Sequence, residues 1–278
     1  WLEYEKWHSK RVGMPAGEVE MPGGHRCTAL LDTGCDGYID VTDLIVRQSN
    51  LAVFPMGESP YTGCGQGYCD IPKMEIGALT IENPPCWYEE RHLQFRVLGI
   101  PVHRYRTATI GLRMMRKFSH ILFDNVNRLV GLNPQDEFEP NEPLQWVCVP
   151  FVIEQISGES RMMVDMSLGG HEMHVMFDTG ASVLMLRSDV WERMSGSVNV
   201  RGGERTRAFS VQFGRLRCRR HTIPEVQIGE LTLENTRTYV LSAESKLWRE
   251  YDGVIGLGCF EETVVVLDFK RNVIWIRK

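Results

Sequence analysis

The chain has 278 residues, 43% of them hydrophobic, and a formal net charge of −5. This length suits two small domains or one large one, and the mild negative charge argues against a nucleic-acid-binding protein. No apolar stretch reaches the roughly 18 residues that a membrane-spanning helix needs, so we expect no membrane span in this chain.

The first predicted element is an irregular arm over residues 1–16. The chain begins at Trp1 rather than Met, so we expect a trimmed or processed form, with any targeting segment outside this sequence. Residues 18–21 alternate between polar and apolar side chains, which predicts a half-buried strand. After a Gly-Gly turn, an apolar run predicts a second strand that ends at Asp32.

The first half continues with a short helix and a hairpin. Thr42, followed by an acidic residue, predicts the N-terminus of an amphipathic helix, and Ser188 does the same in the second half. A glycine-rich hairpin is predicted over residues 61–68. Cys64 and Cys69 are close enough in sequence to bridge a turn of this hairpin, although buried thiols are the simpler interpretation.

The second half repeats the order of the first, which indicates an internal duplication. The repeat is centred on two copies of Asp-Thr-Gly, at residues 32–34 and 178–180, which lie 146 residues apart. Residues 71–83 and 223–235 also match, with six extra residues inserted before the second copy. Shorter matches pair residues 23–25 with 169–171, 42–43 with 188–189, 110–112 with 255–257, and 123–124 with 267–268.

The repeat divides the chain into two lobes and a connection. Residues 1–132 form the first lobe, with Asp32, and residues 161–278 form the second lobe, with Asp178. Residues 133–160 begin as an acidic, proline-rich linker without periodicity, and from Trp146 they predict a strand that joins the lobes.

One aspartate per lobe gives the duplication a chemical meaning. Two lobes related by a pseudo-two-fold axis bring Asp32 and Asp178 together, and carboxyl groups in contact share one proton because both cannot ionise. The ionised carboxylate can take a proton from water while the protonated one polarises a carbonyl oxygen. This is general acid–base hydrolysis of a peptide bond, without a metal or a covalent intermediate.

The residues after each aspartate support the same arrangement. We expect the Thr33 and Thr179 hydroxyls to hydrogen-bond across the axis and lock the two loops together. Gly34 and Gly180 permit the tight turns and bring their N–H groups close to the carboxylates.

The two motifs, each with a later apolar-apolar-Gly strand ending at Gly111 or Gly256, resemble those of pepsin-like aspartic proteases. The short lobes resemble retropepsin-like proteases fused into one chain, and the resemblance covers nearly the whole sequence. It implies an all-β, bilobal fold of two pseudo-two-fold related β lobes with short helices and a substrate cleft between them. It further implies an aspartic endopeptidase that needs no cofactor or metal, with Asp32 and Asp178 as its catalytic pair.

The resemblance also assigns supporting residues. Ser182 stands where the family places a serine that hydrogen-bonds the catalytic carboxylate, whereas Asp36, in the corresponding place of the first copy, resembles the retroviral version. A flap hairpin from the first lobe would close over the cleft, and Tyr61, Gly63 and Gly65 are its candidate residues.

Three other patterns have competing interpretations. Residues 32–43 nearly fit a calcium-binding loop, although Gly34 offers no side-chain ligand and no helix precedes the loop. His171 and His174 lack the zinc-protease spacing, so a solvated hairpin is the simpler interpretation. The arginine cluster within residues 201–220 is either a solvated surface or a lining of the cleft that favours acidic or extended substrates.

We therefore expect a monomeric endopeptidase that acts on polypeptides, binds pepstatin-like inhibitors and has no nucleic-acid partner. The alternative is a catalytically silent binding or inhibitor protein on the same fold, because the match to a flap is loose. A secreted, periplasmic or vacuolar (lumenal) location is expected rather than a cytoplasmic one.

Overall fold

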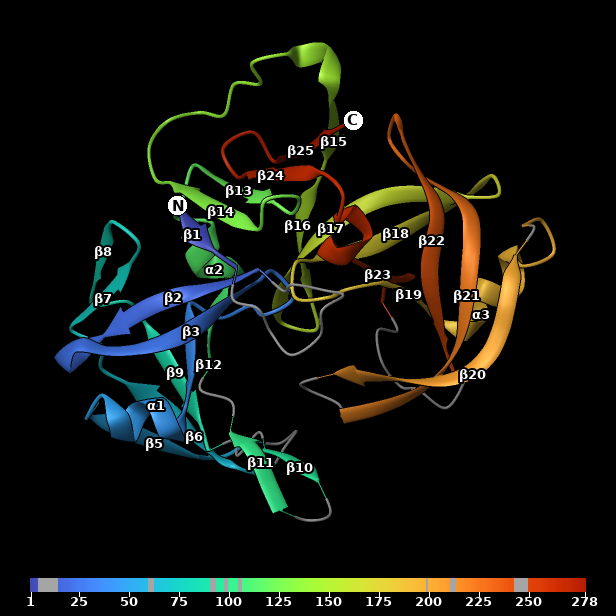
Figure 1. Cartoon of the computed structure of the whole chain (residues 1–278). Helices are drawn as coiled ribbons and strands as arrows, with labels where there is room; N and C mark the ends of the chain where they lie inside the picture. Colours follow the sequence, from blue (N-terminus) through green and yellow to red (C-terminus); the bar gives the residue numbers. More distant parts are fainter. Residues whose placement is uncertain are drawn as a thin grey trace.

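The computed structural model describes residues 1–4, 15–59, 63–90, 94–97, 100–104, 107–198, 200–210, 214–242 and 250–278. Strands dominate these residues and form three large sheets and one separate hairpin, which confirms the all-β prediction (Figure 1). The separate hairpin consists of β10 (Gln94–Val97) and β11 (Ile100–Arg104), and no sequence pattern predicted it.

Residues of the first half build a nine-stranded sheet. Its strands are β2 (Ala16–Met21), β3 (His25–Asp32), β4 (Ile39–Thr42), β5 (Val53–Glu58), β6 (Gly65–Cys69), β7 (Lys73–Ile76), β8 (Leu79–Glu82), β9 (Cys86–Glu89) and β12 (Thr107–Gly111). Their order across the sheet is β5-β6-β9-β4-β12-β3-β2-β7-β8. The antiparallel pair β2–β3 is the predicted opening hairpin, and its second strand ends at Asp32.

Residues of the second half build an eight-stranded sheet. Its strands are β16 (Val152–Ile156), β17 (Glu159–Leu168), β18 (His171–Asp178), β19 (Leu184–Leu186), β20 (Arg201–Ser210), β21 (Gly214–Ile228), β22 (Leu231–Leu241) and β23 (Gly253–Gly256). Their order is β16-β17-β18-β23-β19-β22-β21-β20. Here β17 and β18 form the opening hairpin, which ends at Asp178.

The two sheets repeat one pairing scheme around each aspartate. Strand β3 runs parallel to β12, with Asp32 beside Gly111, and β18 runs parallel to β23, with Asp178 beside Gly256. Strand β12 then pairs antiparallel with β4 and β23 pairs antiparallel with β19. The next pairs, β4–β9 and β19–β22, are parallel in both halves.

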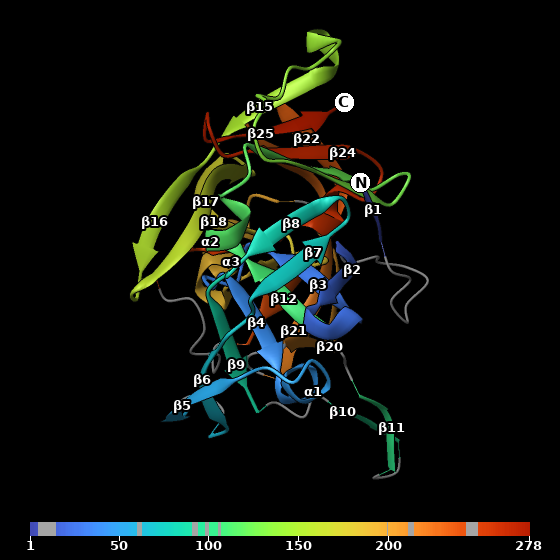
Figure 2. The same ribbon diagram turned by 90° about the vertical axis from the view of Figure 1, so that its left-hand side faces the viewer.

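A six-stranded sheet connects the two halves. It contains β1 (Leu2–Glu3), β13 (His120–Asp124), β14 (Leu129–Asn133), β15 (Trp146–Pro150), β24 (Val264–Asp268) and β25 (Val273–Arg277), in the order β1-β14-β13-β24-β25-β15. The central pair β13–β24 joins a first-half strand to a second-half strand. Both views place this sheet above the nine-stranded sheet (Figures 1 and 2).

The six-stranded sheet bears on two predictions about the ends of the lobes. The predicted strand from Trp146 is present as β15. The prediction of an irregular arm over residues 1–16 is wrong at Leu2–Glu3, because these residues pair with β14. Burial of the Leu2 and Tyr4 side chains explains why this short strand is held in place.

Short helices occupy the turns between strands. They are α1 (Asp43–Gln48), α2 (Leu112–Met115) and α3 (Ser188–Met194), with 3-10 turns at η1 (Pro22–Gly24), η2 (Pro143–Gln145) and η3 (Leu257–Phe260). Thr42 is the N-cap residue of α1 but makes no side-chain capping bond. The prediction of Ser188 as N-cap is off by one residue, because Arg187 holds that position.

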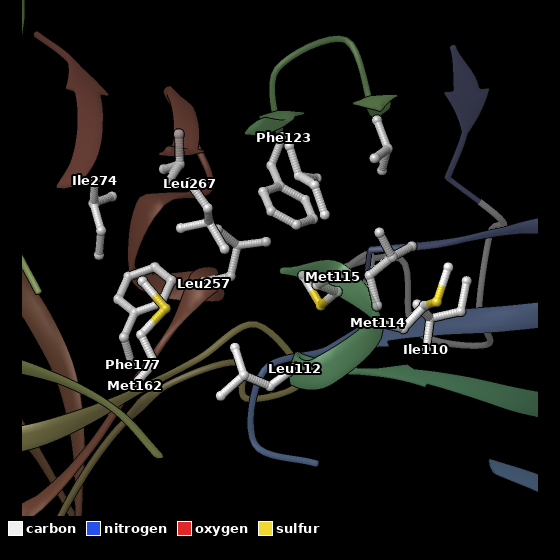
Figure 3. Packing of buried hydrophobic residues seen from close by; sticks show 14 of the residues in the cluster. Ile110, Leu112, Met114, Met115, Phe123, Met162, Phe177, Leu257, Leu267 and Ile274 are labelled. Carbon is white, nitrogen blue, oxygen red and sulfur yellow. The ribbon is translucent and has the colours of Figure 1, made fainter. Parts of the chain in front are cut away.

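One hydrophobic core runs through both halves. Leu112, Met115 and Phe123 from the first half belong to the same buried cluster as Phe177 and Leu257 from the second. Figure 3 shows the two groups facing each other beneath the six-stranded sheet. Because this core is shared, each aspartate-bearing strand is fixed relative to the other.

Two cysteines of the first half meet in a way that the sequence did not predict. Cys69 and Cys86 lie directly opposite each other in β6 and β9, with their sulfur atoms 2.9 Å apart. Both thiols are buried. Cys69 therefore packs against Cys86, because a directly opposed pair on neighbouring strands brings its side chains into contact. Neither Cys64 nor Cys69 is in a disulfide bond.

Candidate active site

The two Asp-Thr-Gly turns meet through a reciprocal pair of threonines. The Thr33 N–H donates to Thr179 Oγ1 at 3.0 Å, and the Thr179 N–H donates to Thr33 Oγ1 at 3.0 Å. Each hydroxyl in turn donates to a carbonyl of the opposite strand, Thr33 to Phe177 at 2.8 Å and Thr179 to Leu31 at 2.7 Å. Four hydrogen bonds, made entirely by buried groups, therefore hold the turns together.

Each glycine of the two turns touches the aspartate of the other turn. A methyl group added to Gly34 would lie 2.8 Å from Asp178 Oδ2, and one added to Gly180 would lie 2.7 Å from Asp32 Oδ1. Each glycine N–H also donates to the aspartate of its own turn, Gly34 to Asp32 at 2.9 Å and Gly180 to Asp178 at 2.7 Å. Glycine is therefore required at both positions, because a side chain would displace a carboxylate.

The two carboxyl groups form one unit. Asp32 and Asp178 are half-buried and hydrogen-bonded to each other. Burial raises the pKa of Asp32, although the hydrogen bonds with Asp178 and the Gly34 N–H oppose the rise. Burial, followed by the charge of Asp32, raises the pKa of Asp178 well above its ordinary value. Raised pKa values at both carboxyl groups are expected for a pair that shares one proton.

Arg161 is a cation beside this pair that no sequence pattern indicated. It lies on β17 with 13% of its side chain exposed, and its Nη1 donates to the Gly34 carbonyl at 2.9 Å. Its guanidinium also pairs with Glu159, and its charge lowers the pKa of both aspartates against the larger effect of burial. At the same distance before Asp32 the first half has Pro15, so the matching position of the repeat carries no cation.

Asp36 connects the first turn to its surroundings. Its carboxylate accepts hydrogen bonds from Arg113 Nε at 3.1 Å and Arg113 Nη2 at 2.6 Å. Ser160, the neighbour of Arg161, donates to the same carboxylate from its hydroxyl and its N–H. Burial acts to raise the pKa of Asp36, but the bonds from Arg113 and Ser160 prevail and lower it. Asp36 is thus an ion-paired residue that supports the first turn and is not part of the Asp32–Asp178 pair.

The other candidate residues have different outcomes. The Ser182 backbone packs against Gly256 and Gly258. The expected hydrogen bond from the Ser182 hydroxyl to Asp178 stays a prediction. Tyr61 lies outside the described residues. Gly63 has a positive φ of 65° and Gly65 begins β6, so both belong to the end of the β5–β6 hairpin, and their role as a flap stays a prediction.

Side chains of the two competing metal-site patterns bind other groups of the protein. Asp36 binds Arg113, and Asp40 accepts a bond of 3.1 Å from the Cys35 thiol, so these acids of the calcium-like loop do not converge. His174 contacts Asp165 through Nδ1 at 2.7 Å and Glu154 through Nε2 at 3.1 Å. Among the described residues, no group of three or more His, Cys, Asp and Glu side chains is arranged to hold a metal ion.

The arrangement can perform proton transfer without a metal or a nucleophilic side chain. A carboxyl pair with raised pKa values holds one group ionised as a base and one protonated as an acid. The Gly34 and Gly180 N–H groups each hold one oxygen of a carboxyl group, and the charge of Arg161 favours the ionised form of both groups.

Comparison with protein families supports this chemistry. Residues 164–258 match the model of a family described as aspartyl protease. The matched segment holds Asp178 and its parallel partner strand β23. A search of curated proteins found no match to the chain. Within the part of the chain that the structure describes, no helix is long and apolar enough to cross a membrane.

Proposed function

We propose that this protein is an aspartic endopeptidase of bilobal, pepsin- or retropepsin-like build, with Asp32 and Asp178 as its catalytic pair. The match of residues 164–258 to the aspartyl protease family supports a peptidase. One observation carries the proposal, namely two hydrogen-bonded, half-buried aspartates, each held by a glycine N–H and pressed against the other turn.

In the proposed reaction the pair begins with one proton. The ionised carboxylate removes a proton from a water molecule, whose oxygen attacks the carbonyl carbon of the peptide bond. The protonated carboxyl gives its proton to the carbonyl oxygen, which forms a tetrahedral diol. The aspartate that took the water proton then protonates the leaving nitrogen, the other aspartate takes a diol proton, and the C–N bond breaks. The pair again holds one proton when the products leave.

We further propose that the β5–β6 hairpin covers the bound polypeptide. Four large apolar side chains are exposed on it, Val53, Phe54, Met56 and Tyr68. Exposed apolar groups gathered on one hairpin are typical of surfaces that bind a partner. The Tyr68 ring also packs edge-on against Trp87 with 4.8 Å between ring centroids, which gives this surface a fixed base on β9.

Cleavage of denatured casein between about pH 3 and pH 7 tests the proposal. We expect cleavage by the wild-type chain and its loss in both Asp32→Asn and Asp178→Asn, because each variant removes one of the two proton-transfer groups. Asp70→Asn is the matched control, since Asp70 is exposed. Pepstatin should block the wild-type activity, because a dyad binds a transition-state mimic tightly.

The result can also contradict the proposal. If either aspartate variant kept wild-type activity, the pair would not be the catalyst. If the folded wild-type chain bound pepstatin but cleaved nothing, the alternative of a catalytically silent binding protein would replace the endopeptidase.

A further inference from the structure

The charges of this protein are strongly segregated. Residues 201–220 contain seven arginines and one glutamate, a net charge of +6. The other 258 residues contain 24 basic and 35 acidic residues, a net charge of −11. Strands β20 and β21 therefore form a basic hairpin on an otherwise acidic protein.

Four arginines of this hairpin lie on one face. Arg205 is directly opposite Arg219, and Arg207 is directly opposite Arg217. Opposed residues, and residues two apart along a strand, point to the same side of a sheet. We call these four residues the arginine face. Their side chains are exposed, and they start about 5 Å apart across the strands and about 6.6 Å apart along them.

The hairpin does not neutralise its arginine face. The single acid within residues 201–220, Glu204, pairs with Arg220 at 2.5 Å on the opposite side. Arg219 donates to the Gly203 carbonyl at 3.1 Å, which leaves its charge in place. Among the described residues, no carboxylate pairs with the arginine face. Like charges placed directly opposite each other destabilise a sheet, so this face is suited to an external anion.

The position of the hairpin leaves room for a ligand. Strand β20 is the last strand of the eight-stranded sheet, with β21 as its neighbour. Figure 1 shows both strands reaching from the body of the second half, with β20 outermost. No strand of the described part of the chain pairs with the outer edge of β20, so an extended chain can lie along it without displacing one of these strands.

We propose that the arginine face binds an acidic segment of a polypeptide in extended conformation. An extended chain presents every second side chain to one side at about 6.6 Å, which matches the spacing from Arg205 to Arg207. Aspartate or glutamate at alternate positions can then meet each arginine, and arginine–carboxylate pairs form two parallel hydrogen bonds.

The charge distribution favours a polypeptide over a nucleic acid. A long nucleic acid would extend past the hairpin and meet the rest of the protein, whose 258 residues carry a net charge of −11. A short acidic segment meets the arginine face alone. That this segment belongs to a substrate rests on the proposed endopeptidase function, whereas the binding itself does not.

Fluorescence anisotropy of a labelled deca-glutamate peptide tests the binding. The full chain carries Asp32→Asn, so that no peptide is cleaved, and a Gly-Ser decapeptide is the neutral probe. The test variant is R205Q/R207Q/R217Q/R219Q, and R205K/R207K/R217K/R219K keeps the charge. The matched control removes four exposed cations elsewhere, R116Q/K117Q/R237Q/K278Q.

We expect the glutamine variant to bind deca-glutamate at least about tenfold more weakly than the parent chain, since four exposed ion pairs are lost. The matched control should stay within about threefold of the parent chain. The lysine variant should fall between the parent chain and the glutamine variant, because it keeps the charge but not the paired hydrogen bonds. All binding should weaken with added salt. The neutral peptide should not bind. Melting curves establish that each variant is folded.

Three results would overturn the proposal. The glutamine variant could bind as well as the parent chain, or the matched control could lose as much affinity, which would make net charge rather than the hairpin responsible. Tighter binding of a 20-base-pair DNA than of deca-glutamate would assign the face to nucleic acid. Arginine-dependent peptide binding by a chain that fails to cleave casein would support this proposal and contradict only the endopeptidase.

Discussion

Thr33 and Thr179 exchange the same two hydrogen bonds between their turns, whereas the residues three positions later differ. In the first half that residue is Asp36, which binds Arg113 and Ser160. In the second half it is Ser182, whose backbone packs against two glycines. The two turns therefore make the same contacts where the carboxylates meet, and they make different contacts three residues further along the chain.

The difference teaches which contacts the site cannot vary. Two carboxyl groups share a proton only if their oxygens stay in contact, so both turns need the same short residues there. The flanking bonds only have to hold each turn in place, and an ion pair or a close backbone contact does this equally well.

Among changes that keep both aspartates, the largest effect should come from adding one methyl group at Gly34 or Gly180. Gly34→Ala and Gly180→Ala each place a carbon 2.7–2.8 Å from the opposite carboxyl group, which must then move. We expect casein cleavage to fall about a hundredfold or more in both, because a displacement of about 1 Å in a reacting group can cost about a hundredfold. Gly196→Ala, where an added methyl meets nothing within 4 Å, is the control.

Equal losses in the two alanine variants would support equivalent turns. A variant that kept wild-type activity would show that its glycine does not confine the opposite carboxylate.

Removal of either threonine hydroxyl should mainly lower stability. Thr33→Val and Thr179→Val each delete two hydrogen bonds and leave a buried N–H of the other turn without its acceptor. We expect each to reduce the free energy of unfolding by about 3 kcal/mol in denaturant titrations. The double variant should lose less than the sum, because the four bonds form one unit.

Thr236→Val is the comparison for this experiment, since the Thr236 hydroxyl makes one bond of 3.5 Å within its own strand. A Thr33→Val variant no less stable than Thr236→Val would show that the bonds between the turns do not hold the halves together.

The smallest effect should come from replacing Arg161, the cation beside the two aspartates. The charge of Arg161 lowers the pKa of Asp32 and Asp178, so Arg161→Gln should raise both. Activity requires one ionised carboxylate, and it is lost as pH falls through the pKa of that group. The acidic limb of the kcat/KM profile should therefore move to higher pH, with activity at the optimum reduced at most about tenfold.

Arg161→Lys should restore the wild-type limb, because it keeps the charge. Arg47→Gln removes an exposed arginine on α1 and should leave the profile unchanged. An unshifted profile in Arg161→Gln would show that the bond to Gly34, not the charge, is what this arginine contributes.

The strands and turns around the two aspartates could be predicted because the signals for them lie in neighbouring residues. An apolar run ending in Asp-Thr-Gly predicts a strand followed by a turn, and β3 and β18 end at Asp32 and Asp178. The repeated residues 110–112 and 255–257 indicated the strands that pair beside them. These signals depend on neighbours in sequence.

Contacts between distant residues were not predictable in the same way. No local pattern marks Arg161, because its partner Gly34 is 127 residues away in the sequence. The opposition of Cys69 and Cys86 depends on the register of β6 and β9, which no single-strand pattern specifies. The β10–β11 hairpin follows from neither the repeat nor the apolar pattern.

The pairing of β13 with β24 makes assembly of the site an event within one molecule. Two separate chains that each carried one aspartate would meet at a rate set by their concentration, and dilution would separate them. Here the covalent connection keeps each half at a high effective concentration relative to the other. Turnover per molecule should therefore stay constant however far the protein is diluted, whereas a turnover that fell with dilution would show that a second copy is needed.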